Sequence, residues 1–252
     1  MYNNKLSIAF PKLVPATFIK RINRFIAEVN INGELIKVHV PTTGRLDTVL
    51  VTGQTCYLLP AANPERKTPY SLFLVATTSS IDSNHTSLVC IDAMVANRFA
   101  RELLENNYIE ELSSIDASIR AEVTYNKDRF DFVVTEQKTA QEDNQIQHLI
   151  EVKSVNMCVD GVACFPDAPT ERGKKHLRSL MQKQAQGTTQ THVIFIIQRS
   201  DANAFSPCFD RDPEFARLLK EAQEVGTKIH ACLTSIKTDG MYFQSWLPIL
   251  YP

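Results

Sequence analysis

Three charged side chains inside two otherwise apolar segments have the types and spacing needed for metal-dependent phosphate chemistry. Asp131 lies in R-F-D-F, and Glu151 and Lys153 lie in the run HLIEVKSV at residues 148–155. Side chains alternate between the two faces of a strand, so Glu151 and Lys153 point to one side while Ile150 and Val152 point to the other. The ordinary alternative is an exposed strand face with a glutamate–lysine ion pair, which would carry no chemistry.

The spacing along the chain predicts that the two carboxylates lie close together. Asp131 and Glu151 are twenty positions apart, and a hairpin connection would make their strands neighbours. We expect Phe130 and Phe132 to face away from Asp131. A carboxylate on each strand, with a lysine two residues after the second, is the D…E-x-K pattern of metal-dependent phosphodiesterases. Carboxylates hold Mg²⁺ or Mn²⁺, the metal polarises a phosphate and acidifies a water, and the lysine positions that water or stabilises developing charge. We predict Asp131 and Glu151 as metal ligands and Lys153 as the catalytic residue.

Basic residues cluster in two places that could contact phosphates. The helix predicted at 168–187 presents Arg172, Lys175 and His176 within about 100° of one another, with Ser179 and Lys183 on the same face. A solvated helix face is the alternative interpretation. Residues 1–90 contain nine Lys or Arg and only five Asp or Glu, so this part of the chain is basic. The predicted DNA-binding residues are Lys20, Arg21, Arg24, Arg45, Arg172, Lys175 and His176.

The elements that carry these residues change in period near residue 90. Five short strands with almost no helix, and an Asn32-Gly33 hairpin signal, predict an all-β OB-like barrel over residues 1–86. From residue 87 to 252 the order is α, β, β, β, α, β, α, β, with helices at 92–112, 168–187 (Thr170 as N-cap) and 212–226. This order implies crossovers and a mixed sheet, as in nuclease cores that use the same triad. The fold class is two-domain α/β, with a solvated loop expected at 135–147.

Composition excludes several classes. The chain has 252 residues, 44% hydrophobic and 22% charged, as an ordinary globular protein does. Its longest apolar run is far too short for a membrane span, and no secretory segment is visible, so we expect no membrane partner and a cytoplasmic location. Six scattered cysteines without a CxxC pair predict neither zinc nor disulfides. We expect His39, His85, His192 and His230 to be single packed or surface histidines.

Several longer motifs resemble the sugar fermentation stimulation protein A family of bacteria and archaea. They are FPDAPTERGKKHL at 165–177, VHVPTTGRL at 38–46, ANRF at 96–99, DRFDF at 128–132, IEVKSV at 150–155 and AFSPCF at 204–209. The resemblance implies an OB-type domain joined to a PD-(D/E)XK, restriction-endonuclease-like domain. It also implies DNA binding with little sequence specificity and a role in regulating sugar (maltose) metabolism. The chain departs from the family pattern at Thr42, where Asn is usual, and at Asp128, where Ser is usual.

The expected function is therefore a DNA-binding protein with a Mg²⁺ or Mn²⁺ site and a regulatory role. The alternative is a metal-dependent nuclease that acts on DNA or RNA. An enzyme acting on RNA or a small phosphodiester is a third hypothesis, because OB folds and nuclease cores accept several polymers. The sequence predicts no oligomeric state.

Overall fold

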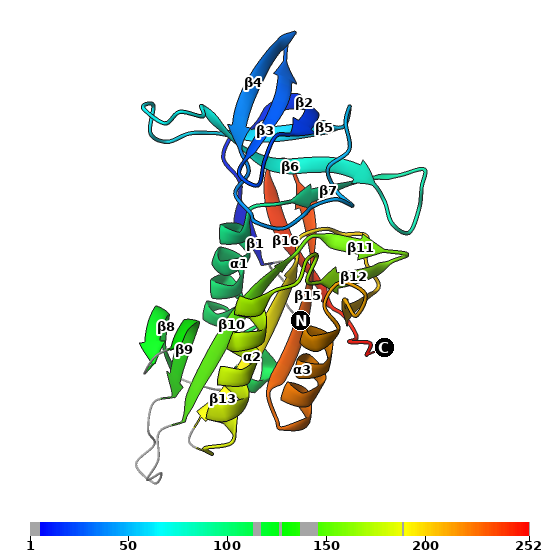
Figure 1. Ribbon diagram of the computed structural model, residues 1–252. Helices are drawn as coiled ribbons and strands as arrows, with labels where there is room; N and C mark the ends of the chain where they lie inside the picture. Colours follow the sequence, from blue (N-terminus) through cyan, green and yellow to red (C-terminus); the bar gives the residue numbers. More distant parts are fainter. Residues whose placement is uncertain (1–5, 113–116, 126–127, 137–145, 188, 252) are drawn as a thin grey trace.

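The computed structural model describes residues 6–112, 117–125, 128–136, 146–187 and 189–251. A barrel of strands lies above a larger layered domain in Figure 1, and strand β10 of that domain runs up toward the barrel. The predicted loop at 135–147 lies mostly outside the described residues. Lys127, between the strand that ends at Tyr125 and the strand that begins at Asp128, also lies outside them.

The upper part is a closed five-stranded barrel with one additional strand. Its order is β4-β3-β2-β5-β6-β7, and a further pairing of β4 with β6 closes it. The predicted OB-like barrel is confirmed. The Asn32-Gly33 turn connects β3 to β4, and both residues have positive φ (51° and 96°), which a tight hairpin of this type requires. The strands are β2 (Val14–Arg21), β3 (Ile26–Ile31), β4 (Glu34–His39), β5 (Thr55–Pro60), β6 (Tyr70–Thr78) and β7 (Thr86–Cys90).

The lower domain is built on a seven-stranded mixed sheet in the order β1-β16-β15-β13-β10-β9-β8. Its centre is parallel, from β10 through β13 to β15, and its other pairings are antiparallel. The mixed sheet is as predicted. Its strands are β1 (Ser7–Ala9), β8 (Ala117–Tyr125), β9 (Asp128–Glu136), β10 (Gln147–Val155), β13 (Thr189–Ile197), β15 (Lys228–Lys237) and β16 (Gly240–Trp246).

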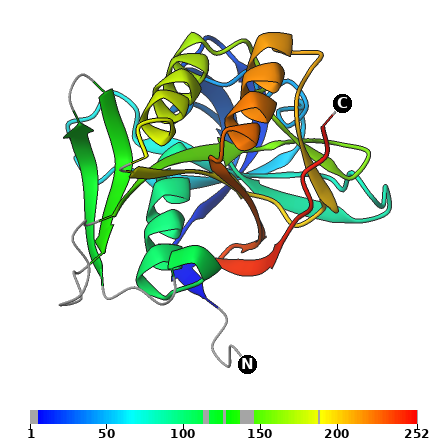
Figure 2. The same ribbon diagram turned by 90° about the horizontal axis from the view of Figure 1, so that it is seen from below.

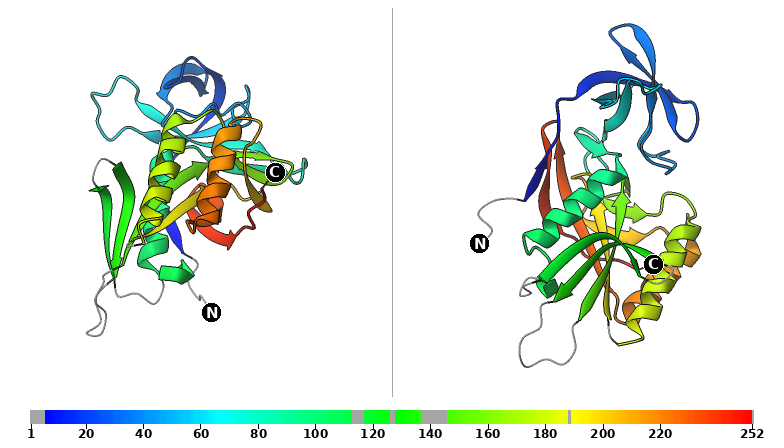
Figure 3. Two further views of the ribbon diagram at one scale, coloured as in Figure 1. Left: turned by 60° about the horizontal axis from the view of Figure 1, so that its bottom comes forward. Right: turned by 90° about the vertical axis from the view of Figure 1, so that its left-hand side faces the viewer.

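Helices cover both faces of this sheet (Figures 2 and 3). Helix α1 (Ala93–Glu105) packs on one face, and the 3-10 turn η1 (Glu110–Leu112) follows it. Helices α2 (Glu171–Gln184) and α3 (Pro213–Glu224) pack on the other face. Thr170 and Asp212 each accept a bond from a first-turn N–H, so both helices begin at caps visible in the sequence.

Short strands near the barrel were not predicted. Strands β11 (Met157–Val159), β12 (Val162–Phe165) and β14 (Ala204–Pro207) form a separate small sheet beside the domain junction. Strand β1 belongs to the early part of the chain but pairs with β16, the last strand of the lower sheet. Strand β7 continues to Cys90. The domain limits at 86 and 87 remain a prediction.

Candidate metal and nucleic-acid site

Glu151 and Lys153 form a buried pair on the face of β10 that is turned toward α2. Glu151 is 4% exposed, and Lys153 Nζ donates to its Oε1 at 2.5 Å. Between them Val152 faces the opposite way, into the core beneath α1, as strand alternation predicts. The exposed-strand alternative is therefore wrong, because this pair is shielded from solvent.

Helix α2 adds a histidine to the same carboxylate. His176 Nδ1 hydrogen-bonds to Glu151 Oε1, and Arg172 Nε donates to His176 Nε2 at 3.4 Å. Since Nε2 accepts from arginine, a neutral ring carries its proton on Nδ1 and donates it to Glu151. The sequence indicated His176 as a DNA contact, whereas the structure places it against Glu151. The helical period of this segment does not give the contact, because the contact depends on how α2 is rotated against the sheet.

Asp131 is positioned where strands β9 and β10 separate. Their backbone ladder ends at Ile150 opposite Phe132, and beyond it the Val152 N–H donates at 2.8 Å to Asp131 Oδ2. Asn97 of α1 donates to Oδ1 at 3.1 Å. The side chain thus replaces a backbone acceptor and holds the gap open.

The surroundings of Asp131 correct one expectation. Phe132 packs in the core under α1, whereas Phe130 packs in the core under α2, so the two rings do not share a face. Strand β9 must therefore twist at Asp131. Glu122 lies opposite on β8 with φ of 55°, a conformation that disturbs regular pairing at this position.

The two carboxylates have opposite pKa shifts. Burial, reinforced by the negative charge of Glu151, raises the pKa of Asp131. Burial acts in the same direction on Glu151, but the Lys153 ammonium and the His176 hydrogen bond outweigh it and lower the pKa of Glu151. The Lys153 ammonium lies against Glu151. Asp131 is therefore the carboxylate that an added cation would stabilise most.

The donor set fits a hard cation in part. Among the described residues, no three His, Cys, Asp or Glu side chains are grouped as a metal site. Asp131 and Glu151 could supply two anionic oxygens, and Mg²⁺ or Mn²⁺ usually completes such a set with waters, carbonyls and substrate phosphate. In the described part of the chain every hydrogen bond to the Glu151 carboxylate goes to Oε1, which leaves Oε2 for a cation.

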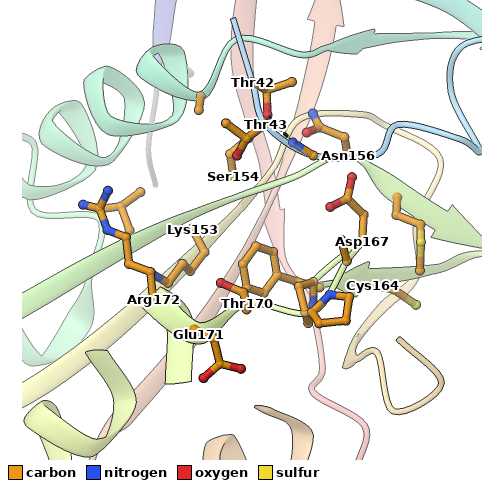
Figure 4. A pocket seen from close by; sticks show the side chains of 18 of the residues that line it. Thr42, Thr43, Lys153, Ser154, Asn156, Cys164, Asp167, Thr170, Glu171 and Arg172 are labelled. Atoms are coloured by element: carbon orange, nitrogen blue, oxygen red, sulfur yellow. Dashed lines mark hydrogen bonds between the residues drawn. The ribbon is translucent and has the colours of Figure 1, made fainter. Parts of the chain in front are cut away.

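A cleft of about 430 Å³ opens beside this cluster, between the two domains. Lys153, Ser154 and Arg172 line it from the lower domain, and Thr42 and Thr43 line it from the barrel (Figure 4). The lining also contains the carboxylates of Asp167 and Glu171 and apolar side chains of the segment 164–169. Its cations and hydroxyl groups are the parts that could contact phosphate oxygens.

Asp167 fixes the barrel loop over this cleft. Its Oδ2 accepts from Leu46 N at 3.1 Å, and a Cβ on Gly44 would lie only 2.5 Å from the same oxygen. Glycine is therefore required for this close approach. Arg211 and Asp47 form a second bridge between the domains at 2.9 Å. The motifs PTTGRL and FPDAP both carried the family resemblance, but their contact with each other was not predicted.

The predicted basic residues have different surroundings. Arg21 donates to the carbonyls of Gly44 and Arg45, both at 2.6 Å, and so stabilises the loop that covers the cleft. Lys20 is exposed and pairs with Glu28. Arg24 lines the cleft, and Arg45 lines a shallower hollow next to it.

On α2, the three predicted contacts also differ. Arg172 lines the cleft and His176 binds Glu151. Lys175 is exposed and lies 4.0 Å from Asp128. Asp128, one of the departures from the family pattern, also accepts from Ser179 at 2.7 Å, so it ties β9 to α2.

A chain of buried histidines crosses the same sheet. Glu136 Oε1 accepts from His148 Nε2 at 2.8 Å, His148 Nδ1 pairs with His192 Nε2 at 3.1 Å, and His192 Nδ1 pairs with His230 Nε2 at 3.2 Å. His192 and His230 are thus linked to each other, contrary to the expectation that they stand singly. An anionic Glu136 requires N–H at His148 Nε2, so each following ring donates from its own Nε2.

Comparisons with known proteins agree along nearly the whole chain. Residues 94–240 match the family model described as the sugar fermentation stimulation protein RE domain, and residues 19–91 match the SfsA N-terminal OB domain. A sugar fermentation stimulation protein homolog of Carboxydothermus hydrogenoformans is 38% identical, over 94% of this chain and 96% of the relative. One from Desulforamulus reducens is 34% identical, over 98% and 96%.

A solved structure has the same fold. The Pyrococcus furiosus SfsA structure, in complex with Ca²⁺, superposes with a TM-score of 0.83 at 25% identity, and the match covers 98% of this chain and 99% of that one. Among the described residues of the present chain, none of the helices has the length and apolar character that a bilayer crossing demands.

Proposed function

Because the chain belongs to the sugar fermentation stimulation protein family, we propose that it binds DNA with little sequence specificity and holds a divalent cation at Asp131 and Glu151. The observation that carries this proposal is the cleft between the domains, which is lined by Lys153, Arg172 and Arg24, and whose Lys153 is bonded to Glu151. Phosphate contacts from such side chains fix a duplex without reading its sequence.

The cation part of the proposal is supported by the opposite pKa shifts of the two carboxylates. The raised pKa of Asp131, caused by burial and by the charge of Glu151, means that a nearby cation would be favourable there. The archaeal relative of similar fold is described in complex with Ca²⁺, a hard cation of the same class. We propose Mg²⁺ or Mn²⁺ for this chain.

Two titrations test the proposal. Mn²⁺ binding, followed by calorimetry, should weaken at least tenfold in Asp131→Asn and stay unchanged in Glu65→Gln, which removes an exposed barrel carboxylate. Binding of a labelled 20-base-pair duplex, followed by fluorescence anisotropy, should weaken steeply with salt and depend little on sequence. Wild-type protein that binds neither Mn²⁺ nor DNA would contradict the proposal.

A second candidate function, cutting of DNA or RNA, is favoured by the position of Lys153. Its ammonium lies on Glu151 and also lines the cleft, so it could contact both the carboxylate and a bound phosphate. A bound divalent cation would supply charge stabilisation and an acidified water. Lys153 would orient the phosphate and stabilise its charge, and the Glu151–His176 hydrogen bond would hold the carboxylate in place.

A cleavage assay separates the two functions. Lys153→Met should abolish any Mg²⁺- or Mn²⁺-dependent cutting and leave DNA binding largely intact, with Lys220→Met, an exposed lysine on α3 that does not line the cleft, as a control. If wild-type protein binds DNA but cuts neither DNA nor RNA with either ion, the binding function stands alone. That outcome would favour the regulatory role in sugar (maltose) metabolism that the family resemblance implies.

A further inference from the structure

The turn between β2 and β3, residues 22–25, presents two apolar side chains to solvent and contributes Arg24 to the lining of the cleft. Phe25 is 51% exposed and Ile22 is 43% exposed. Arg24, between them, lines both the cleft and the neighbouring hollow. The turn therefore combines an exposed aromatic ring with a neighbouring cation that borders an open cleft.

The backbone of this turn is firmly held. Asn23 Oδ1 accepts from Phe25 N at 2.9 Å and from Ile26 N at 3.0 Å. Arg21 Nη2 donates to the Arg24 carbonyl at 2.7 Å, and Val40 N donates to the Phe25 carbonyl at 2.8 Å. The Phe25 ring is therefore exposed while its backbone is held in place. A ligand that covers the ring would lose little free energy to ordering of the turn.

The charges around the ring indicate what could cover it. Arg24 and Arg45 flank the turn, and the cleft continues from Arg24 to Lys153 and Arg172. These cations suit a polyanion, and a nucleic-acid strand is the polyanion that also offers flat apolar faces. Aromatic side chains next to phosphate-binding cations stack on bases in many proteins that bind single strands.

We propose that Phe25 stacks on an unpaired base, so that this protein prefers single-stranded DNA to continuous duplex. Inside a duplex each base is covered by its neighbours on both faces, and a protein ring reaches a base only where the strand is unpaired or kinked. This inference rests on the proposed DNA binding and adds the form of DNA that is bound.

The first test compares two substrates and three proteins. Phe25→Ala should weaken binding of a 20-nucleotide oligo(dT) roughly tenfold and change duplex binding less than about twofold, because loss of one stack affects only the unpaired strand. The matched control is Leu35→Ala, which removes an exposed apolar side chain (61%) from β4 of the same barrel, at the other end of the β3–β4 pair from this turn. It should change neither affinity.

The second test detects the stack directly. The chain has a single tryptophan, Trp246, so wild-type protein gives the background signal. Phe25→Trp should bind oligo(dT) as tightly as wild type, and its added fluorescence should be quenched on binding. Thermal melting should show Phe25→Ala and Phe25→Trp as stable as wild type, since the side chain is exposed.

The outcomes are distinguishable. Wild-type protein that binds duplex at least as tightly as oligo(dT), or equal losses from Phe25→Ala and Leu35→Ala, would overturn the stacking role and leave the proposed DNA binding intact. Absence of quenching in a Phe25→Trp variant that still binds oligo(dT) would also overturn it. Wild-type protein that binds no DNA of either form would overturn the proposed function itself.

Discussion

The two ends of strand β10 carry polar side chains in opposite circumstances. At one end His148 is 1% exposed and lies in a closed chain that runs from Glu136 to His230. Toward the other end Glu151 and Lys153 are also largely buried, but Lys153 lines a cleft that opens to solvent. Within each group the side chains satisfy one another's hydrogen bonds. His230 borders a hollow that it shares with Tyr108 and Trp246, whereas Lys153 borders the cleft between the domains.

The difference teaches which buried polar residues can carry function. A carboxylate and three imidazoles that pair among themselves join four neighbouring strands, and removing one leaves its partners with fewer hydrogen bonds. The Glu151 cluster places an ammonium at the cleft between the domains. Burial and unusual pKa values alone would not separate the two groups, whereas a cation at the cleft between the domains does.

Breaking the histidine chain should have the largest effect on stability. His192→Ala removes a fully buried ring and leaves His148 Nδ1 and His230 Nε2 without the bond each makes to it, so unfolding free energy should fall by about 3 kcal/mol. Urea denaturation measures this. Mn²⁺ and DNA affinities, measured while the variant is folded, should match wild type. His85→Ala, at an exposed loop histidine, should leave stability unchanged.

Removing the charge of Glu151 should have the next largest effect, and this effect should be on Mn²⁺ binding. Glu151→Gln keeps the shape but removes an anionic ligand, so Mn²⁺ binding should weaken about tenfold or more by calorimetry. Binding of DNA should persist or tighten, because a negative charge near the phosphates is gone. Unchanged Mn²⁺ affinity would show that Glu151 is only a structural partner of Lys153.

Acid should destabilise the protein through the histidine chain. Burial, together with the neighbouring rings, lowers the pKa of His192 well below its usual range, and burial lowers that of His230. Both rings are then neutral in the folded protein and take up protons on unfolding. Their contribution to the free energy of unfolding is complete above about pH 6.5. Below that pH it declines by at most about 1.4 kcal/mol per pH unit for each ring.

Melting temperatures at pH 7.5, 6.5 and 5.5 measure this decline. Burial raises the pKa of Asp131, which acts in the opposite direction at pH values near that pKa, since the protonated form is favoured in the folded state. In His192→Asn the slope should be shallower, and an unchanged slope there would contradict the role of this ring.

The smallest effects should distinguish basic residues at the cleft from those away from it. Arg24→Ala should weaken DNA binding several-fold and reduce the salt dependence by about one phosphate contact, because Arg24 lines the cleft. Lys20→Ala should change affinity less than about twofold, because Lys20 is paired with Glu28. Anisotropy at two salt concentrations measures both, and equal losses would place the binding surface elsewhere.

The sequence predicted the parts of the site that depend on local pattern. Strand alternation separates Glu151 from Val152, hairpin connection makes β9 and β10 neighbours, and Thr170 caps α2 as expected. The position of His176 was not predictable in this way, because it depends on how α2 is rotated against the sheet. The same limit explains the histidine chain, whose members meet only once the order of three strands is known.

Contacts across the domain junction were also beyond local pattern. The approach of Gly44 to Asp167 joins segments that are distant in sequence, and neither segment alone indicates a partner. The small strands β11, β12 and β14 are too short to show a clear period, so they were missed. Asn97 lies in the motif ANRF, yet its bond to Asp131 depends on the packing of α1 against the sheet.

The pairing of β1 with β16 affects when the lower sheet can form during synthesis. Residues near the start lie against residues near the end, through the bonds from Phe10 N to the Asp239 carbonyl and from Phe243 N to the Leu6 carbonyl, both 2.8 Å. On the ribosome, the barrel can close early, but the edge of the lower sheet must wait for the last strand to emerge. The barrel is in effect an insertion held at both ends, so a protease cut between residues 82 and 92 should yield two fragments that migrate together until β1 is unfolded.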